Sequence, residues 1–248
     1  MKPIQKRFDL SVSPDNSDVT VVYLYGYVTS QHYWDEQECI ATKDVRQALL
    51  GIKTTEIHLH INSPGGNAFD GIAIHNLLKH HPAKVTAYID GIAASAASVI
   101  AMGANEIIMP KNSMLMIHCA STFAYGNAAE LRKEADTLEK VDTAVANSYK
   151  VRFVGTDEEL AALLADETWL TANEALALGL CNSILEESEA EPQPPKNAIL
   201  QKYGCKSKEE LITKPQAKLN LSNCLEAFLN GVGGCSSDEK FRPAKRRT

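Results

Sequence analysis

Short runs rich in β-branched residues alternate with helical segments along most of this chain, and that alternation limits the folds open to it. Residues 19–28 are rich in Val and Tyr, and 56–61 alternates apolar with polar residues, as strands do. Between 69 and 77 the apolar residues recur at helical spacing instead. Strands and helices in this order favour parallel β-α-β units with right-handed crossovers, so we expect an α/β fold.

The other expected elements follow from the same periodicities and from Gly, Pro and capping residues at their ends. We predict further strands at 85–89, 106–109 and 114–118, and further helices at 35–50, 95–102, 127–153, 156–165 and 171–178. Two Gly-containing stretches, Ser63–Gly66 and Asp90–Gly91, are predicted to interrupt their strands as turns.

One predicted helix, residues 127–153, is long and charged and carries a narrow apolar seam. Leu131, Leu138, Val141 and Val145 make up that seam. A seam on an otherwise charged helix needs a partner surface, so we expect this helix to be an arm for oligomerisation.

The chain is predicted to divide into three parts. Residues 1–18 form an N-terminal segment, 19–185 one domain, and 186–248 a linker and C-terminal extension that is partly disordered or serves assembly. The linker is acidic and proline-rich, and the extension holds amphipathic pieces such as 219–229 and a basic end at 240–247.

Charge and hydropathy exclude several classes of function. The 248 residues carry a net charge of −6 without a basic stripe, so nucleic acid is not an expected partner. No apolar run reaches the ~20 residues of a membrane span, and residues 1–9 lack the apolar stretch of a signal peptide. We therefore expect a cytoplasmic protein that does not bind membranes.

The cysteines do not have the spacing of a metal site or a redox dithiol. There are six, at positions 39, 119, 181, 205, 224 and 235. None forms a Cys-x-x-Cys pair, so we expect reduced thiols, no metal and no cofactor. Cys119 directly follows a candidate catalytic residue, but packing is its expected role.

The run Gly91–Ser98 consists of small and aliphatic residues and would begin a helix at Ser95. A serine there lies beside unpaired backbone N–H groups, which stabilise negative charge developing on a substrate oxygen. His118 ends the predicted strand at 114–118, and an imidazole can accept the serine proton. The pair predicts a serine hydrolase with Ser95 as nucleophile and His118 as base. Ser98, one turn further along, is a weaker candidate for the nucleophile.

A serine nucleophile and its base need an orienting carboxylate and donors for the oxyanion. Asp166 and Glu167, just before a predicted helix, are equal candidates for the carboxylate from local pattern alone. The N–H of Ala96 is one candidate donor. The Gly65–Gly66 loop supplies the other, because glycines let the main chain approach a reacting carbonyl closely.

Four ordered motifs place the chain beside a known family. They are Ile61–Gly66 (INSPGG), Gly91–Ser95 (GIAAS), Met116–His118 (MIH) and Trp169–Ala175 (WLTANEA), the last followed by Gly179–Leu180. Together they resemble the proteolytic subunit of the Clp proteases, serine peptidases. The resemblance is closest to the phage and prophage branch, whose members are head maturation proteases. It covers roughly residues 19–185.

The resemblance implies roles for individual residues. Ser95 and His118 match the nucleophile and the base, and Gly66 and Ala96 match the oxyanion-hole donors. The acid position falls on Glu167, where the family usually has Asp, so Asp166 remains an alternative.

The resemblance also implies where a peptide binds. It would lie as an added strand between two segments of main chain. The residues of these segments are Gly65, Asn67, Ala68 and Phe69 on one side and Cys119, Ala120 and Ser121 on the other.

For the fold and partners, the resemblance implies a spiral of β-α-β units, shared with the crotonases, and a protruding long helix for ring assembly. One ring or two stacked rings would enclose the active sites in a chamber. In the housekeeping branch an ATP-dependent unfoldase feeds that chamber. In the phage branch the expected substrates are capsid, scaffold or portal proteins, in the bacterial host cytoplasm or within the procapsid.

Three other functions compete with peptide hydrolysis. A crotonase-type acyl-CoA enzyme shares the spiral core but needs no Ser–His pair. A signal peptide peptidase uses a lysine base, and the nearest lysine, Lys111, lies in a turn. A ring-forming scaffold protein with a vestigial site would have no reason to keep Ser95, His118 and the glycines together.

Overall fold

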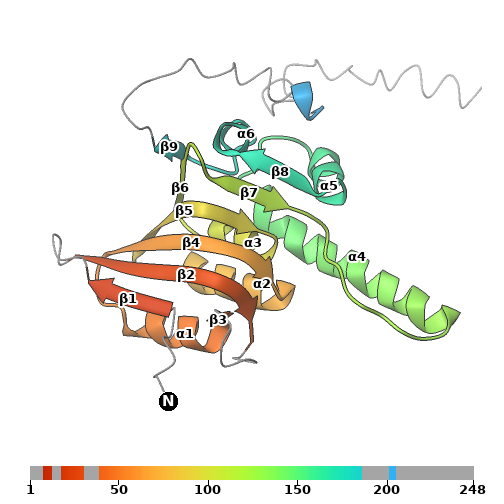
Figure 1. The fold of residues 1–248 in the computed structure, drawn as a ribbon, viewed down its shortest axis with the longest axis horizontal. Helices are drawn as coiled ribbons and strands as arrows, with labels where there is room; N and C mark the ends of the chain where they lie inside the picture. Colours follow the sequence, from red (N-terminus) through yellow and green to blue (C-terminus); the bar gives the residue numbers. More distant parts are fainter. Residues whose placement is uncertain (1–7, 13–17, 31–38, 186–200, 205–248) are drawn as a thin grey trace, which may run out of the picture. The chain divides into compact units, whose positions relative to one another are not determined.

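The fold is built around one mixed sheet with helices packed against it (Figure 1). The computed structural model describes residues 8–12, 18–30, 39–185 and 201–204. Its strands are β1 (Phe8–Val12), β2 (Val19–Thr29), β3 (Cys39–Ala41), β4 (Glu56–Gly66), β5 (Lys84–Ala94), β6 (Glu106–Pro110), β7 (Met114–Ile117), β8 (Thr168–Thr171) and β9 (Ser183–Leu185). Its helices are α1 (Thr42–Gly51), α2 (Ala68–Lys79), α3 (Ala96–Met102), α4 (Ala128–Lys150), α5 (Asp157–Ala165) and α6 (Ala172–Ala177).

The sheet runs in the order β1-β2-β4-β5-β6-β9, with β3 beside β2 and β7 joining β5 to β8. The central strands β2, β4, β5 and β6 are parallel, as the alternation of strands and helices predicts. The β1–β2 and β7–β8 pairs are antiparallel, so the sheet is mixed rather than purely parallel. The α/β prediction is confirmed, and the antiparallel pairs are an addition to it.

Several predicted boundaries are wrong. The β4 strand continues through Ser63–Gly66, and β5 continues through Asp90–Gly91, where turns were expected. Shifts in register absorb the irregular backbone there without ending the strands. The helix expected at 35–50 begins at Thr42, because 39–41 forms β3. The short strands β1, β3, β8 and β9 were not predicted, because pairing with other segments of the chain creates them.

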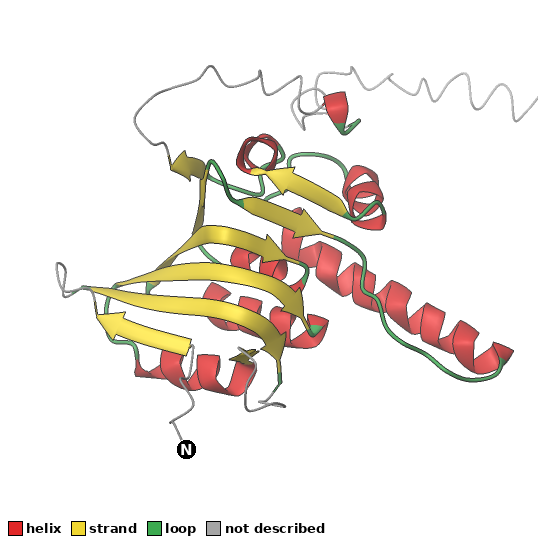
Figure 2. Ribbon diagram, viewed as in Figure 1, coloured by secondary structure: helices red, strands yellow, loops and turns green. Residues whose placement is uncertain are grey.

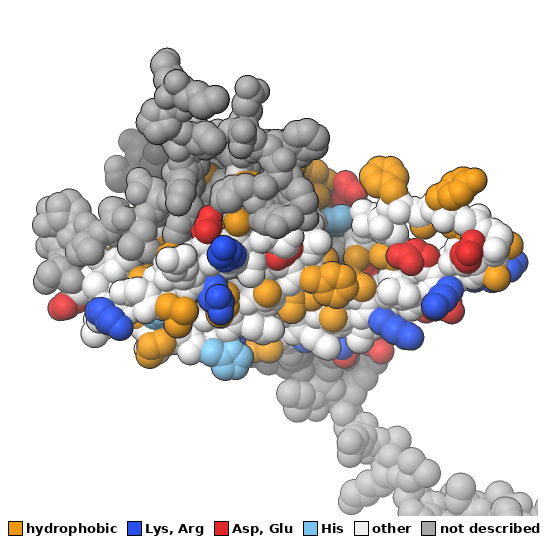
Figure 3. Space-filling model, turned by 90° about the horizontal axis from the view of Figure 1, so that it is seen from below, with side chains coloured by type: hydrophobic (Ala, Val, Ile, Leu, Met, Phe, Trp, Pro, Cys, Tyr) orange, Lys and Arg blue, Asp and Glu red, His pale blue; other side chains and the backbone are white. Residues whose placement is uncertain are grey.

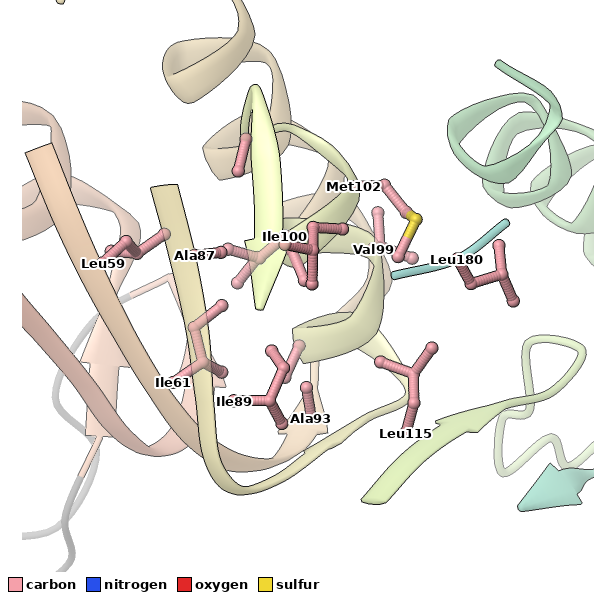
Figure 4. Packing of buried hydrophobic residues seen from close by; sticks show 14 of the residues in the cluster. Leu59, Ile61, Ala87, Ile89, Ala93, Val99, Ile100, Met102, Leu115 and Leu180 are labelled. Atoms are coloured by element: carbon pink, nitrogen blue, oxygen red, sulfur yellow. The ribbon is translucent and has the colours of Figure 1, made fainter. Parts of the chain in front are cut away.

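Helices α2 and α3 lie against the sheet and bury a continuous apolar core (Figure 2). Every residue of α3 is buried, which explains why this helix carries small and apolar residues on all sides. Figure 4 shows part of the packing. Side chains from β4, β5, α3 and β7 meet there, among them Leu59, Ile89, Ile100 and Leu115.

Helix α4 extends beyond the sheet, and only its C-terminal part is buried (Figure 1). Its buried residues are Val145, Ser148 and Tyr149, whereas Leu131 of the predicted seam is 43% exposed. The prediction of a long helix is confirmed. Its seam is covered at Val145, half-buried at Leu138 and Val141 and exposed at Leu131.

The surface around this core is chemically mixed. On the described part of one face, Lys and Arg side chains are interspersed with Asp, Glu and apolar ones (Figure 3). None of the helices described has both the length and the apolar content to cross a bilayer. The predicted linker, the amphipathic piece at 219–229, the basic end at 240–247 and Cys205, Cys224 and Cys235 lie outside the described residues.

Candidate active site

Ser95 lies at a sharp turn where β5 ends and α3 begins. Its backbone has φ 54° and ψ −125°, a conformation that L-residues rarely adopt. Such strain persists only where the surroundings hold it, and it is concentrated at functional sites. The turn leaves Ser95 partly exposed between buried neighbours, so its hydroxyl faces outward from the core.

His118 reaches Ser95 because β5 and β7 are paired. Ala94 lies opposite Met116 in this pair, and the Ser95 N–H donates to the Met116 carbonyl at 3.0 Å. His118 follows two residues later. Its Nε2 lies 2.8 Å from the Ser95 Oγ, within hydrogen-bonding distance. For Ser95 to donate this bond, the ring must be the tautomer with its proton on Nδ1.

The register of β7 and β8 separates the two candidate acids. Ile117 lies opposite Thr168 in this antiparallel pair, so one further step would place His118 opposite Glu167. Asp166 is one residue further away and ends α5 as its C-cap. Successive side chains of a strand alternate between its faces, so the register favours Glu167 over Asp166.

The structure does not, however, bring either acid into contact with the imidazole. Glu167 has φ 48°, and its carboxylate accepts a long 3.4 Å hydrogen bond from the Trp169 indole. Both Glu167 and Asp166 are exposed. Within the described residues, no hydrogen bond joins His118 to either carboxylate. No local sequence pattern predicts the contact between Trp169 and Glu167.

The two glycines at the end of β4, Gly65 and Gly66 (the glycine loop), lie directly against the Ser95 turn. A Cβ built on Gly65, which has φ +95°, would lie 2.6 Å from the Ala94 carbonyl and 2.7 Å from the Ser95 Cβ. The same atom on Gly66 would collide with the Val28 carbonyl. The loop is held from within by the Ser63 hydroxyl, which accepts the Gly65 N–H at 3.1 Å. Only glycines allow this approach, which brings their main chain beside Ser95.

Ala96 is the first residue of α3, so its N–H has no acceptor within the helix. Ser98 is fully buried, and its hydroxyl donates to the Ser95 carbonyl at 2.6 Å. The alternative of Ser98 as nucleophile therefore has no support, because its oxygen faces the interior instead of the imidazole.

Several main-chain donors predicted to bind a peptide are already paired. The Asn67 N–H donates to Val28, and the Asn67 side chain caps α2. The Cys119 N–H donates to Leu164 and the Ala120 N–H to the Asp142 carboxylate at 2.6 Å. These contacts were not foreseen, and Asp142 gave no sequence signal beyond its place on the long helix.

The remaining predicted binding residues are more accessible. Ala68 and Phe69 begin α2, where Phe69 is 65% exposed, and Ser121 is exposed on the other side. The Cys119 thiol is partly buried, and burial raises its pKa, as do the nearby Asp142 charge and hydrogen bond. It is therefore a protonated thiol rather than a reactive thiolate at neutral pH.

A second polar cluster lies on β2, β4 and β5. Asp90 accepts the Tyr25 hydroxyl at 2.6 Å, and its other oxygen lies 2.9 Å from the Nδ1 of His60. The His60 ring stacks against Tyr23 and Tyr88. Asp90 is distant from His60 in sequence but adjacent across the parallel strands, so no local pattern predicts this contact.

The Ser–His pair at a strained strand-to-helix turn defines a serine-hydrolase class of site, and comparisons with known proteins narrow that class. The family model described as Clp protease matches residues 36–188. The ATP-dependent Clp protease proteolytic subunit 2 of Treponema denticola is 34% identical over 161 residues, 62% of this chain and 80% of that protein. The same-named subunit of Corynebacterium glutamicum is 28% identical, over 55% of this chain and 69% of that protein.

A solved structure, a point mutant of ClpP1 from Listeria monocytogenes, matches with a TM-score of 0.55 and 24% identity, over 68% of this chain and 92% of that one. At 24% identity this match shows a shared fold and nothing further. The family model and the Treponema relative show that this chain belongs to the Clp protease family and is a serine-type peptidase. The match to the solved structure agrees with its ClpP-like α/β fold.

Proposed function

We propose that this chain hydrolyses peptide bonds with Ser95 as nucleophile and His118 as general base. One observation carries the proposal: the 2.8 Å contact between the Ser95 Oγ and the His118 Nε2, at a strained turn beside a glycine loop. Membership of a family of proteolytic subunits supports the same chemistry.

The proposed reaction has two stages. As the Ser95 Oγ attacks the scissile carbonyl carbon, its proton passes to His118, and the carbonyl oxygen becomes an oxyanion. The N–H groups of Gly66 and Ala96 would donate to that oxyanion. His118 then returns the proton to the leaving amine. Water attacks the acyl-enzyme by the same route, which releases the acid and restores Ser95.

Glu167 is the proposed acid, with Asp166 as the alternative. The β7–β8 register supports Glu167, and its side chain would leave the Trp169 indole to reach the His118 Nδ1. In that position it would hold the imidazole in the tautomer that the Ser95 contact requires. The peptide would lie between the segment from Gly65 to Phe69 and residues 119–121 as an added strand.

The same proposal includes assembly into rings. The exposed N-terminal part of α4, where Leu131 is 43% exposed and Leu138 is only half-buried, supports it, because apolar residues on an exposed helix are stabilised by a second surface. One ring or two stacked rings would enclose the Ser95 sites. Relatives are named as subunits of ATP-dependent proteases, so an ATP-dependent unfoldase is a proposed partner.

For the natural substrate we propose capsid, scaffold or portal proteins of a phage, in the host cytoplasm or the procapsid. The resemblance of the four motifs to the head maturation branch supports this. Co-expression with the structural proteins of candidate phages, followed by mass spectrometry of the cleaved products, tests it. Cleavage that requires Ser95 is the supporting outcome.

A fluorophosphonate probe tests the catalytic proposal. The full-length protein should be labelled at Ser95, and Ser95→Ala and His118→Ala should each lower peptide hydrolysis by about 10³-fold or more. Native mass spectrometry should show the same assembly for both variants as for the parent. An assembled parent that takes no label and cleaves no peptide would instead support the vestigial scaffold.

A further inference from the structure

A buried chain of hydroxyl groups links the long helix α4 to the Ser95 turn. The Ser98 Oγ donates to the Ser95 carbonyl at 2.6 Å and lies 2.7 Å from the Tyr149 Oη. A serine hydroxyl has one proton, and here it goes to the carbonyl, which can only accept. Tyr149 must therefore be the donor in its contact with Ser98.

This series of hydrogen bonds ends on the Ser95 carbonyl, which accepts more than one hydrogen bond. The Ser95 carbonyl also accepts the N–H groups of Ser98 at 3.0 Å and Val99 at 3.3 Å. Both Ser98 and Tyr149 are almost completely inaccessible to solvent, so water cannot replace either hydroxyl. Buried hydrogen-bond networks of this kind rigidify the groups that they join.

Because the peptide group is planar, the orientation of the Ser95 carbonyl determines the orientation of the Ala96 N–H. The Ser95 carbonyl and the Ala96 N–H belong to one planar trans peptide, so they point in opposite directions. Fixing the carbonyl toward Ser98 therefore fixes the Ala96 N–H toward the opposite side, away from the helix interior. That N–H is one of the two proposed oxyanion donors.

We propose that Tyr149, acting through Ser98, is a positioning residue that sets the orientation of the Ala96 N–H in the oxyanion hole. The inference rests on the proposed peptidase function. Tyr149 touches neither the substrate nor the reacting atoms. It holds the peptide plane against the strain of the Ser95 backbone, and loss of its hydroxyl would let that plane rotate.

The test removes single hydroxyls from the full-length assembled protein. Tyr149→Phe keeps the ring that fills the core, and we expect kcat to fall about tenfold, less than the 10²–10³-fold typical when an oxyanion donor is lost outright. KM for a short fluorogenic peptide should stay within about a factor of two, because the donor acts only on the transition state. A peptide boronate, which forms a tetrahedral adduct on serine, should bind about tenfold more weakly.

Two further variants complete the design. Ser98→Ala should produce the same pattern, and the double variant should be no worse than Ser98→Ala alone, because both changes break one chain. Tyr25→Phe is the matched control. It removes an equally short hydroxyl hydrogen bond, to Asp90, away from the Ser95 turn, and should leave kcat and boronate affinity unchanged.

The outcomes separate the inference from the proposed function. A parent protein that cleaves peptides, with Tyr149→Phe or Ser98→Ala unchanged in kcat and boronate affinity, overturns the inference alone. A rise in KM at constant kcat also overturns it, since that is the mark of a lost substrate contact. A parent protein that neither cleaves peptides nor binds the boronate would contradict the proposed peptidase function itself.

Discussion

The two sides of the candidate active site are built differently. Ser95 and His118 follow the paired strands β5 and β7, and hydrogen bonds with β7 and with α3 hold the Ser95 turn. Gly65 packs closely against this turn. Glu167 is exposed, lies before a four-residue strand and bonds to Trp169 rather than to the imidazole. The core therefore fixes the positions of the proposed nucleophile and base, whereas the proposed acid has to turn its side chain to reach the imidazole.

The largest effect on peptide hydrolysis should come from adding an atom beside Ser95, on the side of the site that the core holds rigid. Gly65→Ala places a Cβ 2.6 Å from the Ala94 carbonyl at a φ of +95°, so either the loop or the Ser95 turn must shift. We expect peptide hydrolysis to fall by about hundredfold, as when an oxyanion donor is lost. Hydrolysis rates and labelling by a fluorophosphonate probe measure this.

Gly51→Ala is the control for that variant. A Cβ on Gly51, at the end of α1, has no atom within 4 Å, so the change should leave both activity and stability intact. Full activity in Gly65→Ala would show that the glycine loop does not constrain Ser95.

The next largest effect should come from the side of the site that carries the proposed acid, Glu167. Glu167→Gln should lower kcat by about tenfold, less than the ~10⁴-fold seen when a buried triad acid becomes an amide, because Glu167 is exposed. Asp166→Asn, a matched change one residue away, should have almost no effect on kcat. A larger loss from Asp166→Asn would move the acid to that residue, against the strand register.

The same contrast explains what the sequence could predict. Ser95, His118 and the glycines carry strong local signals, because a strained turn and a close approach each demand particular residues. Their meeting then depends only on the pairing of two strands. Local pattern did not distinguish Glu167 from Asp166; the family resemblance placed the acid at Glu167, and the β7–β8 register favours the same residue.

Long elements such as β2, α2 and α4 were also predictable from periodicity, since each spans several repeats of its pattern. The short strands β3, β8 and β9 were not, because pairing with distant neighbours creates them. Contacts such as Asp90 with His60, or Tyr149 with Ser98, join residues at least 30 positions apart, and no local pattern reports them.

A smaller effect on kcat should follow from removing the hydrogen bond that Trp169 donates to Glu167. Trp169→Phe keeps an aromatic ring but removes the indole N–H that holds Glu167. A weak exposed hydrogen bond of about 0.5 kcal/mol corresponds to about a twofold change, so kcat should rise about twofold. Nitrogen NMR of His118 should show more of the tautomer with its proton on Nδ1. A fall in kcat would indicate that the indole positions Glu167 productively.

The smallest effect on activity should come from the far end of β8, where Glu174 caps α6. Burial raises the pKa of Glu174, but hydrogen bonds from Lys202 and the Thr171 N–H outweigh it and hold the pKa at about 2. The folded state thus favours the carboxylate. Its stabilisation is complete above the ordinary carboxyl pKa of about 4.3 and is lost as the pH falls toward 2.

Glu174→Gln should therefore lower Tm by roughly 2–4 °C at pH 7, the shift that about 1 kcal/mol produces in a chain of this size. The difference from the parent should shrink below pH 4 and vanish near pH 2, while peptide hydrolysis at pH 7 changes little. Glu158→Gln, an exposed carboxylate in the first turn of α5, is the control. If the Tm difference stayed constant down to pH 2, the charge of Glu174 would not be its source. If hydrolysis fell together with Tm, the end of β8 would influence the position of the proposed acid, Glu167. Helix α6 would then belong to the flexible side of the candidate active site.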